Sequence, residues 1–145
     1  MDKHKKIRLI TIICLIVIIP LGLYTKAYAG SGQDWVNNSS GGIFYEIFWC
    51  LLILLIVPKL QPNNIAIGVF FFTCVLEFMQ LWKPPFLQTL RGTFLGATIL
   101  GTSFVPSDFI HYIIGAILGW FFVVIIVRAA GAKKAGKHIR HVENM

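Results

Sequence analysis

The chain has 145 residues, of which 57% are hydrophobic and 13% are charged, and its formal net charge is +7. Soluble domains average about 45–50% apolar and about 25% charged residues, so this composition excludes an ordinary soluble globule. The cations gather at the ends of apolar runs and not along an aromatic-lined face, which argues against nucleic acid as a partner. We therefore predict an all-α, polytopic transmembrane helix bundle in a single membrane domain.

The first apolar run, residues 7–24, follows a basic N-terminus. The same pattern with the A-x-A sequence at 27–29 also resembles a cleavable signal peptide. Lys26 in the would-be cleavage region and the 18-residue apolar run favour retention as a membrane anchor. Residues 25–40 are predicted to be an exposed polar connector.

Three further runs, 41–57, 65–82 and 109–127, reach or approach the roughly 17–25 residues that cross a bilayer as a helix. Residues 58–64 contain two prolines and two asparagines and predict a tight turn between the second and third helices. Residues 128–145 form a basic tail.

The segment 86–105 is moderately apolar but contains an arginine and three glycines, so its topology is ambiguous. With four crossings, the cations before the first run, in the 58–64 turn and after the last run all face the cytoplasm, and only Lys26, Lys83 and Arg91 lie outside. A fifth crossing would export the cationic tail. We therefore predict cytoplasmic termini and a re-entrant or interfacial hairpin over 86–105 on the outer side.

Glu77 is the strongest site candidate, because an unpaired carboxylate inside an apolar run costs several kcal/mol. Polar groups from separate segments fall at one predicted depth, which predicts a shared ligand-binding site formed by Glu46, Glu77, Gln80, Arg91, Asp108, His111 and Tyr112. We expect Arg91 to lie within ion-pair or single-water reach of Glu77 or Asp108. Structural alternatives stay open: Asp108 as a helix N-cap, Arg91 at the headgroups, and His111 as an interfacial hydrogen-bonding residue.

No metal-ligand spacing occurs, and no cofactor or metal is expected. Cys14, Cys50 and Cys74 are interpreted as buried hydrophobic residues. Gly115 and Gly119 form a GxxxG motif, which favours close helix packing inside the chain and leaves an oligomer possible.

Several short motifs resemble the small bacterial membrane family called domain of unknown function 2809: residues 77–81, 90–96 and 100–104, with Ser107, Asp108, Tyr112 and Gly115. The resemblance covers about 22–127 and implies retention of the first helix, a shared polar site and a bacterial plasma membrane. The order E-x-x-Q, then arginine, then aspartate is more distantly similar to VanZ-like proteins, some of which are associated with glycopeptide resistance in the cell envelope. Glu46 stands where the family pattern has an aspartate, which preserves the charge but alters its reach. His111 replaces what is usually a small residue, so no histidine role is inherited.

The leading hypothesis is an outer-leaflet polar pocket that binds membrane lipid or another cell-envelope component. One alternative is an intramembrane enzyme, with Glu77 as general base and Asp108 and His111 as auxiliary catalytic groups. Another is a structural accessory subunit in which the polar residues clasp the helices together. A protein with a binding site should retain a specific lipid, an enzyme should turn one over, and a clasp should affect stability alone.

Overall fold

The computed structural model describes the backbone of residues 1–143 and the side chains of residues 1–132, and this part of the chain is helical with no strand. Four helices are long and apolar enough to cross a membrane, and they confirm the predicted fold class. They are α1 (Lys3–Ala27), α3 (Gly41–Ile56, extended upstream by short turns), α4 (Pro62–Met79) and α7 (Asp108–Glu143).

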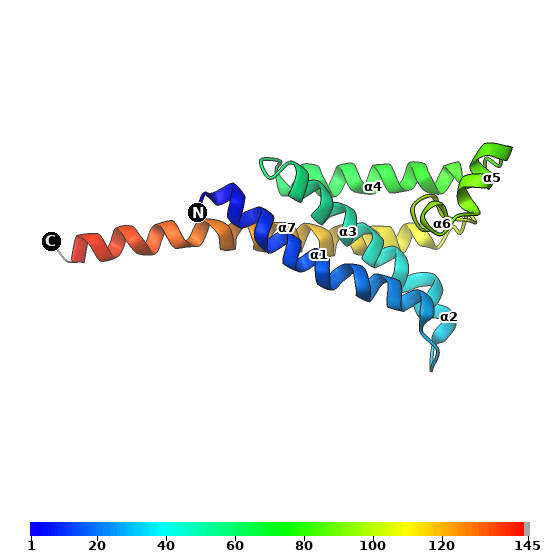
Figure 1. Cartoon of the computed structure of the whole chain (residues 1–145), viewed down its shortest axis with the longest axis horizontal. Coiled ribbons are helices and arrows are strands. Elements are labelled where there is room, and N and C mark those ends of the chain that lie inside the picture. The colour runs from blue at the N-terminus through cyan, green and yellow to red at the C-terminus, as the bar shows by residue number, and fades with distance from the viewer. Residues whose placement is uncertain (144–145) are drawn as a thin grey trace.

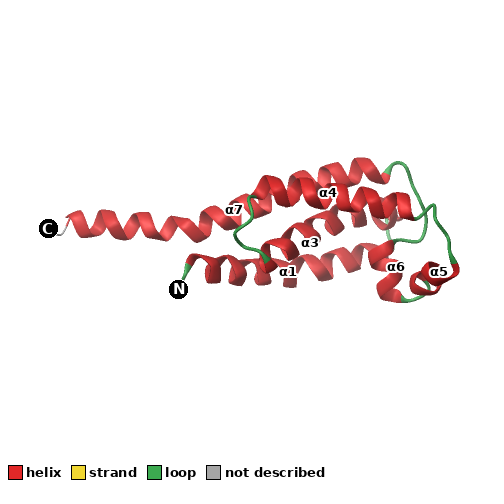
Figure 2. Cartoon of the chain, turned by 90° about the horizontal axis from the view of Figure 1, so that it is seen from above, coloured by secondary structure: helices red, strands yellow, loops and turns green. Residues whose placement is uncertain are grey.

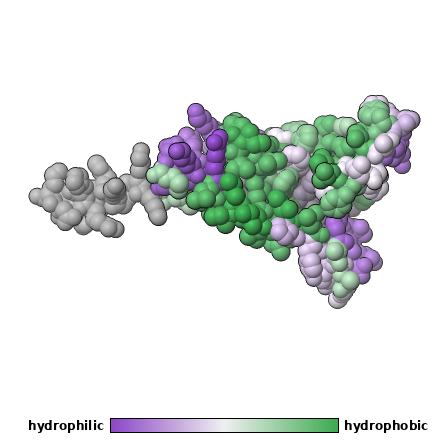
Figure 3. Space-filling view, viewed as in Figure 1, coloured by the Kyte–Doolittle hydropathy of each residue, from purple (hydrophilic) through white to green (hydrophobic). Residues whose placement is uncertain are grey.

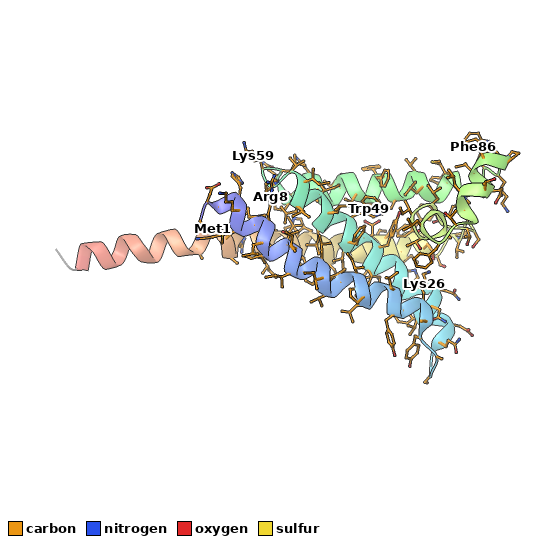
Figure 4. All side chains as sticks on the ribbon, viewed as in Figure 1. Met1, Arg8, Lys26, Trp49, Lys59 and Phe86 are labelled. Atoms are coloured by element: carbon orange, nitrogen blue, oxygen red, sulfur yellow. The ribbon has the colours of Figure 1, made fainter. Side chains whose placement is uncertain are left out.

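The four long helices lie side by side, and both termini lie at the same end of the bundle (Figures 1 and 2). Arg8 and Lys59 lie toward this end, which we call the termini end (Figure 4). Lys26 and Phe86 lie toward the opposite end, where the short helices α5 and α6 are found, and we call it the hairpin end.

Helix α3 is central to the packing, since it contacts α1, α4 and α7. Its residues Cys50, Leu51 and Leu54 are fully buried, as is Val123 of α7. Large apolar side chains on the outer faces remain exposed, among them Ile16 and Phe71 at 65% each. They form an apolar belt between hydrophilic ends (Figure 3), as expected of helices whose surroundings are lipid.

Residues 25–40 connect α1 to α3 and are mostly exposed, as predicted, but most of them are helical and do not form a loop. Helix α1 runs to Ala27, and after Gly32, whose φ is 72°, the short α2 (Gln33–Trp35) and a π-helical turn (Val36–Ser40) lead into α3. A π turn is wider than an α turn and needs added support. Here the Lys26 ammonium donates to the Asn37 carbonyl at 3.3 Å, and the Ser40 hydroxyl donates to the Val36 carbonyl.

The ambiguous segment folds as two short helices, α5 (Pro85–Arg91) and α6 (Phe94–Leu100), each far shorter than a membrane crossing. The Thr93 hydroxyl caps α6 by accepting from the Gly96 amide at 3.0 Å. A Cβ at Gly96 would overlap the Leu90 carbonyl, so the tight hairpin needs glycine there. The segment predicted as a basic tail, 128–145, continues α7 without a break as far as Glu143.

Both termini lie at the termini end of the bundle, so we expect them on the same side of the membrane. We expect reporter fusions after Met145 and after Gly32 to report opposite sides of the membrane, with the Met145 fusion cytoplasmic, because ten cations lie in the predicted cytoplasmic segments and three in the outer ones. An enzyme reporter active only in the cytoplasm, paired with one active only outside, makes the measurement. An external C-terminus would contradict the assigned orientation.

Candidate functional site

Glu77 lies in the last turns of α4 with none of its surface exposed, and its carboxylate accepts three hydrogen bonds. One oxygen accepts from the Val105 amide at 2.8 Å, and the other accepts from the Gln80 side-chain amide and the Tyr112 hydroxyl, both at 2.8 Å. We call Glu77, Gln80, Val105 and Tyr112 the Glu77 cluster. It joins α4, the 101–107 loop and α7 at the hairpin end.

Local sequence explains how the loop reaches this carboxylate. Gly101 has a φ of 69°, a conformation that other residues rarely adopt, and it ends α6. A Cβ at this position would lie 2.6 Å from the Gln80 side-chain nitrogen. The glycine therefore lets the chain turn directly against Gln80 and carry Val105 back to Glu77.

Glu46 lies on α3 with no exposed surface and forms a second buried polar contact. One of its oxygens accepts from the Thr73 hydroxyl, while the other has no hydrogen-bond partner in the described part of the chain. Thr73 and Glu77 are four residues apart and share a face of α4. Sequence reasoning missed Thr73, although its spacing from Glu77 was a usable signal.

Arg91 is hydrogen-bonded to backbone carbonyls, and its single-water reach to Glu77 or Asp108 stays a prediction. Arg91 is 6% exposed, and its guanidinium donates to the carbonyls of Met79 at 2.9 Å and Trp82 at 3.0 Å. Among side chains through residue 132, the expected direct ion pair with Glu77 or Asp108 is absent. The physical reason is that the last carbonyls of a helix lack intrahelical partners. The cation binds the carbonyl of Met79, the last residue of α4, together with that of Trp82 just beyond the helix.

Asp108 and His111 lie one turn apart at the start of α7, with 3.9 Å between a carboxylate oxygen and the His111 Nδ1. They are partly exposed, at 24% and 14% of the side chain. The Asp108 carboxylate makes no capping hydrogen bond within the described chain, so the N-cap alternative has no geometric support.

Lys26 approaches the same corner of the bundle. A Cβ at Gly41 would lie 3.3 Å from the Lys26 Nζ, and one at the adjacent Gly42 would lie 3.5 Å from the His111 Cβ. We call Lys26, Asp108 and His111 the rim cluster. It brings a cation, an anion and an imidazole to one corner, where the absence of side chains at Gly41 and Gly42 lets Lys26 and His111 pack closely against α3.

A separate groove of about 330 Å³ lies between α4 and α7, and none of the predicted ligand-binding residues lines it. The seven predicted residues fall into four groups. Glu77, Gln80 and Tyr112 meet directly, and Glu46 is hydrogen-bonded to Thr73. Arg91 of α5 binds a carbonyl at the end of α4, and Asp108 and His111 form a pair. No group of three potential metal ligands occurs among the described side chains.

Four spanning-length helices around buried carboxylates define the class: an all-helical integral membrane protein with a polar interior at one end. Residues 31–116 match the family described as "Protein of unknown function (DUF2809)", and the chain belongs to this family. The matched region contains the whole Glu77 cluster, Glu46, Thr73, Arg91, Asp108 and His111. No solved structure matches the chain.

Proposed function

We propose that this membrane protein binds an envelope lipid through the rim cluster, and that the ligand is a headgroup with both a phosphate and an amine. The observation that supports this is the presence of opposite charges at one corner, an exposed Lys26 and a partly exposed Asp108: Lys26 would contact the phosphate and Asp108 the ammonium group. His111 lies between α3 and Asp108 and would complete the polar lining. The distant VanZ-like resemblance agrees with an envelope ligand.

In this proposal the Glu77 cluster shapes the site without contacting the ligand. Tyr112 follows His111 directly in α7, so its hydrogen bond to Glu77 fixes the helix turn that carries the rim residues. Glu77 has no exposed surface and already accepts three hydrogen bonds, so a role as general base would require the 101–107 loop to open. The geometry therefore favours binding over the enzyme hypothesis.

Lipid retention by the purified full-length chain tests the proposal. We expect native mass spectrometry to show stronger retention of phosphatidylethanolamine than of phosphatidylglycerol or phosphatidylcholine with the same acyl chains. Lys26→Gln and Asp108→Asn should each lower phosphatidylethanolamine retention by about tenfold or more, since a hydrogen bond to a charged group contributes about 1.5–3 kcal/mol.

Matched controls are available on exposed surfaces. Lys83→Gln and Asp34→Asn make the same chemical changes outside the rim cluster and should leave retention unchanged. Equal retention of all three lipids by the wild type and the rim variants would contradict the proposal. Loss of thermal stability without any change in lipid selectivity would instead favour a purely structural role.

A further inference from the structure

The groove between α4 and α7 is an unassigned feature on the membrane-facing surface. Its floor contains Ala66 and Ala116, each 9% exposed, and its apolar walls include Phe70, Ile113 and Ile117. On each helix the lining residues span seven positions, which corresponds to roughly 10 Å along the helix axis. The groove is thus an elongated slot with small residues at its base.

One polar contact closes the slot at the termini end. The Trp120 indole N–H donates to the Asn63 side-chain oxygen at 2.6 Å, and both residues line the groove. The remaining lining is apolar. A slot of this length fits inside one leaflet, whose hydrocarbon depth is about 15 Å, and its polar end includes Asn63 in the first turn of α4.

The chemistry and length of the lining favour an acyl chain. Apart from Asn63 and Trp120 at one end, the lining offers no hydrogen-bonding side chain, and the slot of about 330 Å³ runs for roughly 10 Å along α4 and α7. A single extended hydrocarbon chain can contact the floor and both walls.

Two exposed cations lie beyond the polar end of the slot. Lys59 lies in the loop that precedes Asn63, and Arg128 lies on α7 about 12 Å beyond Trp120. Basic residues beside the membrane surface attract anionic lipid headgroups. Their position at the termini end, away from the rim cluster, makes this groove independent of the proposed function.

We propose that the α4–α7 groove holds one acyl chain of an anionic phospholipid from the leaflet at the termini end, with the headgroup beside Lys59 and Arg128. The apolar slot recognises the chain, and the two cations select the charge of the headgroup. This site differs from the rim cluster in leaflet, in lipid charge and in the part of the lipid that is bound.

Photo-labelling of the full-length protein in phosphatidylcholine vesicles tests this proposal. A phosphatidylglycerol probe with a photoreactive group in its acyl chain should label Ile67 and Ile117 in the groove at least about fivefold more than Ile13 and Ile16, which are exposed on α1. Ala116→Leu fills the floor and should lower groove labelling by at least about fivefold while labelling of α1 stays the same.

Each variant has a matched control. Ala129→Leu makes the same change at an exposed position of α7 outside the groove lining and should not alter labelling. Lys59→Gln, at an exposed loop position, should lower phosphatidylglycerol labelling about fivefold, whereas Lys83→Gln at the hairpin end should not. Equal labelling of the groove and α1, or equal labelling by phosphatidylcholine and phosphatidylglycerol probes, means nonspecific boundary lipid and overturns the proposal.

Discussion

Replacing Glu77 by leucine should destabilise the protein more than any other single change in the polar interior. Leucine has a similar size but accepts no hydrogen bond, so the Val105 amide, the Gln80 amide and the Tyr112 hydroxyl all lose their acceptor. Each buried group left unpaired costs about 1–3 kcal/mol, so the total loss is roughly 3–9 kcal/mol. We expect the midpoint of thermal unfolding, measured by size-exclusion chromatography of heated detergent samples, to fall by about 10 °C or more.

Glu77→Gln is the informative companion to this variant. Its side-chain oxygen can keep the Val105 amide, and its NH₂ can donate to Gln80 after that amide flips and to Tyr112 after its hydroxyl turns. We therefore expect Glu77→Gln to accumulate and unfold much more like the wild type. Asp34→Leu, which removes an exposed carboxylate of α2, should leave the midpoint nearly unchanged. A wild-type midpoint for Glu77→Leu would show that the three hydrogen bonds do not hold the hairpin end together.

The need of Glu77 for buried polar partners was predictable because the cost of burying a carboxylate can be estimated from sequence alone. Its partners were only partly predictable. Gln80 follows from helical spacing, but the Val105 amide belongs to a loop backbone, whose position depends on the turn at Gly101. No side-chain pattern reveals such a donor.

Carboxylates and backbone carbonyls compete for Arg91, and the sequence does not show which of them it binds. Charge alone pairs it with the nearest predicted carboxylate, yet the structure uses it to satisfy the carbonyls of Met79 and Trp82. Helix-end carbonyls occur in every helix and carry no sequence signature, so the preference for them depends on where α4 ends. The Lys83-Pro84-Pro85 sequence sets that end and brings α5 back against it.

The spanning helices were predicted well because their apolar length is fixed by the thickness of the bilayer. Helical structure outside the bilayer was predicted poorly. The 33–40 region is polar and resembles a loop in composition, but its turns are stabilised by Lys26 and Ser40, and α7 continues beyond the apolar run that defined its predicted end. Hydropathy identifies the membrane crossing and does not mark the end of a helix.

Gly115→Ala should show whether the GxxxG motif in α7 serves helix packing within the chain or a dimer interface. An added Cβ at Gly115 would lie 2.6 Å from the Glu46 Cβ and 2.9 Å from the Ile43 carbonyl, and one at Gly119 would lie 2.7 Å from the Cys50 sulfur. Both glycines therefore pack against α3 within the chain, and the substitution forces apart the helix pair at the centre of the fold. We expect a destabilisation of about 1–3 kcal/mol or more in the same thermal unfolding measurement.

Gly68→Ala provides the control for this substitution, because Gly68 lies in the spanning helix α4 and an added Cβ there meets nothing within 4 Å. It should be neutral or slightly stabilising, since alanine is the better helix former. The mass of the protein–detergent complex gives the second readout. If the glycines formed a dimer interface, Gly115→Ala would convert a dimer to a monomer whose unfolding midpoint is unchanged. That outcome would contradict the intramolecular packing, whereas a lower midpoint at constant mass follows from the contacts of Gly115 with α3.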